Sequence, residues 1–79
     1  MRNSWHPPIH LRLGNGGEIT RVTDVFEAAH ILIYRWPSRG AAHKRALDEC
    51  MKALRGKVDP TEARQAFTEA ARKAGIHAE

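Results

Sequence analysis

A chain of 79 residues is about half the usual length of one domain, so residues 1–79 are expected to form a single domain around one core. The formal net charge of +4 permits binding to nucleic acid or to an acidic partner but does not require it. Cys50 is the only cysteine, which excludes a disulfide within the chain and favours a reducing compartment.

Membrane association is not expected either. No stretch approaches the roughly 20 consecutive apolar residues that are needed to span a bilayer. The N-terminal segment reaches two prolines, Pro7 and Pro8, before any apolar signal core appears. We therefore expect a cytoplasmic protein with no membrane partner.

The first predicted elements are two strands. Residues 9–13 alternate apolar and polar side chains, which is the period of a half-buried strand, and residues 14–17 (Gly-Asn-Gly-Gly) suit a hairpin turn. The return strand over residues 18–22 is less regular, because Ile19 and Val22 differ in parity. Either a bulge intervenes or the strand ends before Val22. A two-stranded hairpin is marginal alone and must rest on the helices that follow.

The period changes at Thr23, where Thr23 or Asp24 can cap a first helix. Phe26 and Ile33 are expected to widen its apolar stripe, and Pro37 is expected to end it, since the residue before a proline resists helical dihedral angles. The stripe itself recurs every three or four positions, at Val25, Ala28, Ala29, Leu32 and Trp36.

Two further helices are predicted. The second runs from about Ala41 to Arg55 and stops at Gly56. The third begins after Asp59, with Pro60 in its first turn and Glu62 placed to close a capping box. Its apolar face and its end are formed by Ala63, Ala66, Phe67, Ala70, Ala71, Ala74, Gly75 and Ile76, with Gly75 as the stop and Ile76 folding back.

The predicted fold class is therefore α+β, with an N-terminal two-stranded antiparallel hairpin packed on three α-helices in the order β-β-α-α-α. The alanine-rich face of the third helix implies close helix packing, with Phe67 as its one large anchor. The two largest side chains, Trp5 and Trp36, are expected to cover the end of this small core, although either could be an exposed anchor for a partner.

Reactive or metal-binding groups do not form a recognisable pattern. His6 and His10 lie roughly 13 Å apart in an extended segment, which is too far to share an ion. Cys50 falls mid-helix on the apolar face, where a cysteine behaves as a small hydrophobic residue rather than a nucleophile. We therefore expect no catalytic residue, no metal and no cofactor, and predict that the protein is not an enzyme.

The basic residues of the first two helices are the main functional signal. Arg35, Arg39, Lys44 and Lys52 are the candidate contacts for nucleic acid or for a protein partner. Lys44, Asp48 and Lys52 are spaced by four, however, and can pair with one another on the helix surface. Such mixed signs are more typical of a solvated face than of a stripe that follows phosphates, so nucleic-acid binding is the alternative rather than the preferred function.

As a set, several motifs resemble a family of small uncharacterised bacterial proteins, known chiefly from rhizobia and related soil bacteria, that is called domain of unknown function 982. The resemblance covers nearly the whole chain: Trp5 with Pro8, Ala28 to Leu32 leading into Trp36-Pro37, then Ala46, Cys50, Ala53, Leu54 and Gly56, and finally residues 63–67 with Ala70-Ala71. The chain departs from the expected pattern at Ala42-His43, where a more aromatic residue is expected. The resemblance implies a shared fold and supplies no catalytic residues.

Together these observations favour a non-enzymatic interaction or regulatory module. Its expected partner is another protein or a second copy of the chain, because a short hairpin has edges to protect and a small core gains from an interface.

Overall fold

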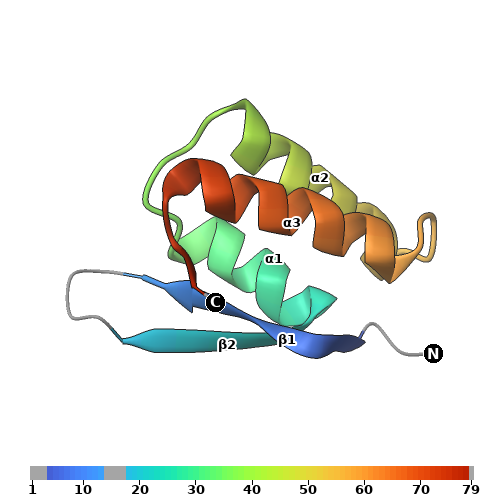
Figure 1. The fold of residues 1–79 in the computed structure, drawn as a ribbon. Helices are drawn as coiled ribbons and strands as arrows, with labels where there is room; N and C mark the ends of the chain where they lie inside the picture. Colours follow the sequence, from blue (N-terminus) through green and yellow to red (C-terminus); the bar gives the residue numbers. More distant parts are fainter. Residues whose placement is uncertain (1–3, 14–17, 79) are drawn as a thin grey trace.

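The computed structural model describes residues 4–13 and 18–78, and its three helices lie on one face of a small sheet (Figure 1). The element order is β1 (Ser4–Arg12), β2 (Ile19–Asp24), α1 (Val25–Tyr34), α2 (Ala41–Leu54), α3 (Pro60–Ala74) and β3 (His77–Ala78). The chain therefore has the predicted α+β fold in the predicted β-β-α-α-α order, with one short strand added at its end.

The sheet is antiparallel with the strand order β2-β1-β3, so β1 is central. The predicted pairing of the first two strands is confirmed, although β1 begins earlier than predicted, at Ser4. The hairpin turn predicted over residues 14–17 lies outside the described residues. β3 pairs with β1 only at His10 and Leu11, whereas β2 is an edge strand along its whole length.

Both explanations offered for the parity of Ile19 and Val22 are wrong. The pairing runs without a shift from Ile19 to Val22, and β2 continues to Asp24. The irregularity falls instead on β1, between the pairs made by Ser4 and Ile9. Val22 is fully buried whereas Ile19 is exposed, so their different parity only places them on opposite faces of the sheet.

The third strand was not predicted, because two residues are too short to show a period. Gly75 adopts a left-handed conformation (φ 73°) at the end of α3, as predicted for a helix stop. The Ile76 N–H then donates to the Ala71 carbonyl oxygen at 3.0 Å, and Ile76 is buried. This turn brings His77 opposite Leu11 of β1.

Three aromatic rings form the centre of the core between the sheet and the helices. The Phe67 ring lies 5.6 Å from the Trp5 ring and 5.4 Å from the Trp36 ring, measured between centroids. Both tryptophans are buried, as expected of core residues rather than exposed anchors. Trp5 Nε1 donates to the Pro60 carbonyl oxygen at 3.1 Å, which fixes β1 to the start of α3 and satisfies the indole N–H.

Small side chains let α2 and α3 pack closely. Ala46 and Ala53 of α2 are at most 3% exposed, and the alanines on the inner face of α3 are at most 5% exposed. The structure confirms the predicted role of Phe67 as the large anchor of α3, because Phe67 is fully buried. The Asp59 side chain caps α3 by accepting from the Thr61 N–H at 2.9 Å. Within residues 4–13 and 18–78, Glu62 does not close the predicted capping box.

The prediction for the first helix needs correction. Phe26 and Ile33 do not widen the buried stripe, because both side chains are exposed, and Ile31 is buried in their place. The helix also ends at Tyr34, so Trp36 reaches the core from the link that follows α1 rather than from the helix itself. α1 thus buries one side against the core and leaves apolar side chains on the other.

Candidate interaction surface

Helix α1 is held firmly at its first turn. The Asp24 side chain accepts from the Glu27 N–H at 2.7 Å, and Glu27 Oε1 in turn accepts from the Thr23 N–H at 2.8 Å and from Thr23 Oγ1 at 3.0 Å. This reciprocal pair is the capping-box arrangement, displaced by one residue so that Glu27 reaches Thr23. Asp24 was one of the two predicted caps, whereas the return bond from Glu27 to Thr23 was not predicted.

The last turn of α1 is tied to the segment that follows it. The Leu32 carbonyl oxygen accepts from His43 Nε2 of α2 at 2.7 Å, and the Ile33 carbonyl oxygen accepts from Arg39 Nη2 at 3.0 Å. Carbonyls in the last turn of a helix have no partner within the helix, so these two contacts satisfy them. The last turn of α1 is therefore held in place by contacts from outside the helix.

The outer side of α1 is apolar and aromatic. Phe26, His30, Ile33 and Tyr34 are spaced by four, three and one, which places them on one side of the helix; we call these four residues the α1 face. Phe26 is 68% exposed, Tyr34 71% and Ile33 38%. The His30 and Tyr34 rings lie 4.8 Å apart between centroids, so the face carries a paired aromatic cluster.

Helix α2 adds apolar surface beside α1. Figure 1 shows α1 and α2 running in opposite directions over the sheet, and the bond from His43 to Leu32 joins the start of α2 to the end of α1. Met51 is exposed and Leu47 is half-buried on α2. They contribute to a shallow groove of about 720 Å³, which we call the α2 groove, lined by Ala41, Lys44, Arg45, Leu47, Asp48, Met51 and Arg55.

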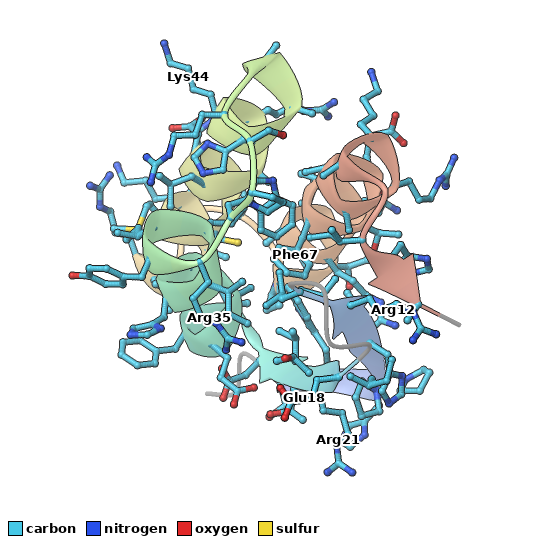
Figure 2. The ribbon with its side chains drawn as sticks, turned by 90° about the vertical axis from the view of Figure 1, so that its left-hand side faces the viewer. Arg12, Glu18, Arg21, Arg35, Lys44 and Phe67 are labelled. Atoms are coloured by element: carbon cyan, nitrogen blue, oxygen red, sulfur yellow. The ribbon has the colours of Figure 1, made fainter. Side chains whose placement is uncertain are left out.

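The four basic residues predicted as contacts do not converge. Lys52 is engaged by its own helix, because its ammonium group lies 3.2 Å from Asp48 and 3.7 Å from Glu49. The hydrogen bond and charge of Asp48, with the charge of Glu49, raise the pKa of Lys52. Figure 2 shows Lys44 projecting from the outer side of α2, far from Arg35 at the end of α1 near the sheet. Arg39 folds back onto the end of α1.

Cys50 is fully buried in the core, on the inner side of α2. Burial, with a smaller contribution from the charge of Glu49, raises the pKa of its thiol from 9.0 to about 12. The group is therefore a protonated thiol at neutral pH, although the thiolate is the reactive form. Within the described ranges, 4–13 and 18–78, no three His, Cys, Asp or Glu side chains gather as a metal ion would require.

A second hollow, of about 410 Å³, lies between α2 and α3. Its charged lining includes Glu69 and Lys73, which lie 3.8 Å apart and pair with each other. Arg72 also lies 3.9 Å from Glu69. This hollow therefore offers less unpaired charge and fewer large apolar side chains than the outer side of α1 and α2.

Reasoning from the sequence missed the α1 face, although the sequence carries a signal for it. Every residue of α1 except Glu27 and His30 is apolar, so apolar side chains surround the helix. A helix that is apolar all round is normally enclosed by other protein. With three helices on a small sheet, this chain encloses α1 on one side only, and the other side is left without a partner.

Comparison with known proteins gives two matches. The sequence model of the family described as Protein of unknown function (DUF982) matches residues 7–78. The chain is also similar to the NMR structure of the Agrobacterium tumefaciens protein Atu1219, a structural genomics target, with 38% identity and a TM-score of 0.78 over 96% of this chain and 76% of that chain. No curated protein matches. Among the described residues, none of the helices has the length and apolar character needed to cross a membrane.

Proposed function

Since the chain belongs to the family Protein of unknown function (DUF982), its fold brings no established activity with it, and we propose that it is a non-enzymatic interaction module that binds another protein through the α1 face. The expected consequence of binding is regulatory, because the module offers a surface rather than a reactive centre.

The observation that carries this proposal is the concentration of exposed apolar side chains on α1. Of the five large hydrophobic residues that are exposed among residues 4–13 and 18–78, Phe26, Ile33 and Tyr34 lie on α1 and Met51 lies on the neighbouring α2. Large exposed apolar clusters commonly mark protein-interaction sites, and aromatic side chains carry much of the binding energy at such sites. The rigid caps of α1 add to this, because a preformed surface loses less conformational entropy on binding.

The chemistry of Cys50 supports the non-enzymatic part of the proposal. Its thiol is the strongest nucleophile that the chain carries, and it is enclosed by the core and protonated at neutral pH. His43, the histidine of α2, donates to the Leu32 carbonyl oxygen and is buried as well.

Site-specific photo-crosslinking in the native cell tests the proposed surface. A photoreactive phenylalanine analogue replaces Phe26 or Tyr34, and a matched analogue replaces Arg72, which is exposed on α3. We expect the two α1 positions to capture the same protein and the α3 position not to capture it. Adding the substitution Ile33→Ser should abolish the capture. Equal capture from α1 and α3, or no capture from α1, would contradict the proposal.

Nucleic-acid binding through Arg35, Arg39, Lys44 and Lys52 stays the alternative prediction. It has less support, because Lys52 is paired with two acids and Lys44 projects away from Arg35. A titration of duplex DNA at low salt tests it, since contacts to phosphate are strongest there. Binding that weakens steeply with salt and is lost in Lys44→Ala would favour this alternative.

A further inference from the structure

Positive charge borders the apolar surface on both helices. Lys44, Arg45 and Arg55 line the α2 groove around Leu47 and Met51. The one acid in that lining, Asp48, shares its carboxylate with Lys52 at 3.2 Å. Over residues 4–13 and 18–78, none of the three cations lies within ion-pair distance of an acid. The groove therefore combines an apolar floor with an uncompensated basic rim.

Two further cations, Arg35 and Arg39, follow the end of α1 and lie apart from Lys44. Because α1 and α2 run in opposite directions, Arg55 at the end of α2 lies toward the end of the surface where α1 begins (Figure 1). Cations thus stand at both ends of the surface. The acids at the start of α1, Asp24 and Glu27, have carboxylate oxygens engaged in the helix cap.

This distribution argues against a second copy as the occupant. A two-fold pairing of the surface with itself would bring one basic rim against another, and like charges face to face disfavour association. An acidic rim on the partner would instead pair with cations that the fold leaves unpaired. The complement of this surface is therefore apolar at its centre and negatively charged at its edges.

The open edge of β2 argues against an extended strand as the occupant. The Arg12 N–H donates to the Ile76 carbonyl oxygen on the β3 side, so the alternate β1 residue Leu11 faces β2 with its backbone groups. Its partner Thr20 therefore bonds toward β1, and the N–H groups of the alternate residues, Arg21 and Thr23, point toward the open edge. The Thr23 N–H is already taken by Glu27 Oε1, and the charged Arg21 occupies the middle of the strand. Both are ordinary devices that keep a sheet edge from adding a strand.

The dimensions of the α1 face suit a helix. From Phe26 to Tyr34 the face spans about 12 Å at the helical rise of about 1.5 Å per residue. A partner helix with apolar residues at i, i+3 or i+4 and i+7 presents a stripe of about the same length. We propose that the occupant is an amphipathic α-helix of another protein whose apolar stripe is flanked by acidic residues, an inference that rests on the proposed function of the α1 face.

Selection from a peptide library tests this chemistry directly. The library displays helical 18-residue peptides with a fixed apolar stripe or none, and with acidic, basic or uncharged residues at the flanking positions. The bait is the full chain, and the counter-bait is the variant Phe26→Ser/Tyr34→Ser, whose folding is checked by circular dichroism. We expect peptides that bind only the wild-type chain to carry the apolar stripe with Asp or Glu on its flanks.

A matched pair of synthetic peptides then measures the contribution of charge. Exchanging the flanking acids of a selected peptide for lysine should weaken binding about tenfold at low salt, and the difference should shrink as salt is added. In the variant Lys44→Glu/Arg55→Glu the preference should reverse toward the lysine peptide. An unchanged preference in that variant would overturn the assignment of the rim.

Several outcomes contradict the inference while leaving the proposed function intact. Selected peptides with basic or uncharged flanks, or with extended proline-rich sequences, would show that the α1 face binds a different partner. Sedimentation equilibrium that finds a dimer lost in Phe26→Ser/Tyr34→Ser would identify a second copy as the occupant. A library that yields no peptide dependent on the α1 face would overturn the inference as well. Failure of the proposed function itself is recognised separately, by the absence of capture at Phe26 and Tyr34 in the cell.

Discussion

Helices α1 and α3 use their apolar residues in different ways. On α3 the apolar side chains form one stripe, and its inner residues are at most 5% exposed: Ala63, Ala66, Phe67, Ala70 and Ala71. The outer side of α3 carries Glu69, Arg72 and Lys73, which pair among themselves. On α1 the apolar residues surround the helix, and Phe26 and Tyr34 lie mostly in solvent.

This difference separates two requirements that the sequence of a helix can meet, which are folding and binding to a partner. The composition of α3 is accounted for by folding alone, because each apolar residue on its stripe contacts the core, while its charged residues either face water or, like Arg64, bond to β1. Folding accounts for the apolar residues on only one side of α1. The aromatic residues on its outer side contribute little to this core, so a second requirement, which we assign to binding, explains their presence.

A pair of phenylalanine substitutions gives the largest contrast between the two helices. Phe67→Ala should lower the free energy of unfolding by about 3–5 kcal/mol, because it empties the centre of the aromatic cluster. Phe26→Ala should change it by less than about 0.5 kcal/mol, because the ring is exposed. Urea denaturation followed by circular dichroism measures both. A loss above about 2 kcal/mol in Phe26→Ala would mean that the α1 face belongs to the core.

Helix α2 repeats the contrast within two adjacent residues, since Cys50 is fully buried and Met51 is exposed. Burial in the folded state raises the pKa of the Cys50 thiol from 9.0 to about 12. Between these values the unfolded state loses its proton first, so the stability present below pH 9 should fall as pH rises, by up to about 1.4 kcal/mol per pH unit.

The variant Cys50→Ala is the control for this pH dependence, because lysine and tyrosine side chains also titrate in alkaline solution. The difference in unfolding free energy between wild type and variant, measured from about pH 8 to 11, isolates the thiol. A difference that does not change with pH would show that solvent reaches Cys50. Peroxide should meanwhile oxidise Met51 in the folded chain before Cys50 reacts.

The same contrast limits what the sequence can predict. Boundaries set by local chemistry were predicted well: α3 starts at Pro60 after the Asp59 cap and ends before Gly75, where the backbone turns left-handed. Such signals act within one turn of chain. The strand β3 was missed because its two residues are defined only by their pairing with Leu11 and His10 of β1.

The candidate site was harder to predict for a related reason. Periodicity shows that α1 has apolar side chains on several sides, but the side that meets the core depends on how α2 and the sheet are placed. Ile31 and Ile33 are two residues apart and chemically identical, yet only Ile31 is buried. The basic residues were predicted as a group from their closeness in sequence, and the link between α1 and α2 points Lys44 away from Arg35.

Two arginines on α3 extend the comparison to charged residues. Arg64 Nη1 donates to the Pro7 carbonyl oxygen at 2.7 Å, and its guanidinium carbon lies 5.9 Å from the centre of the Trp5 ring. Arg64→Ala should therefore lower the free energy of unfolding by about 1–2 kcal/mol, since it removes a charge-assisted hydrogen bond and a cation–π contact. Arg72→Ala, which loses only an exposed pair with Glu69 at 3.9 Å, should change it by less than about 0.5 kcal/mol. Equal effects on thermal unfolding would show that Arg64 has no structural role.

The smallest predicted effect concerns the one helix start that lacks a side-chain cap among the three described. Asp24 caps α1 and Asp59 caps α3, whereas Gly40 at the start of α2 offers no side chain, and its backbone is extended (φ −149°) with open space around the position of a Cβ atom. Gly40→Asp should therefore raise the free energy of unfolding by about 0.5 kcal/mol, through a bond to the first-turn N–H groups and its charge at the helix start. The same exchange at Gly75, whose φ is 73°, should instead lower it, because a side chain disfavours that conformation. If thermal unfolding shows no gain in Gly40→Asp, the start of α2 is already satisfied by other contacts.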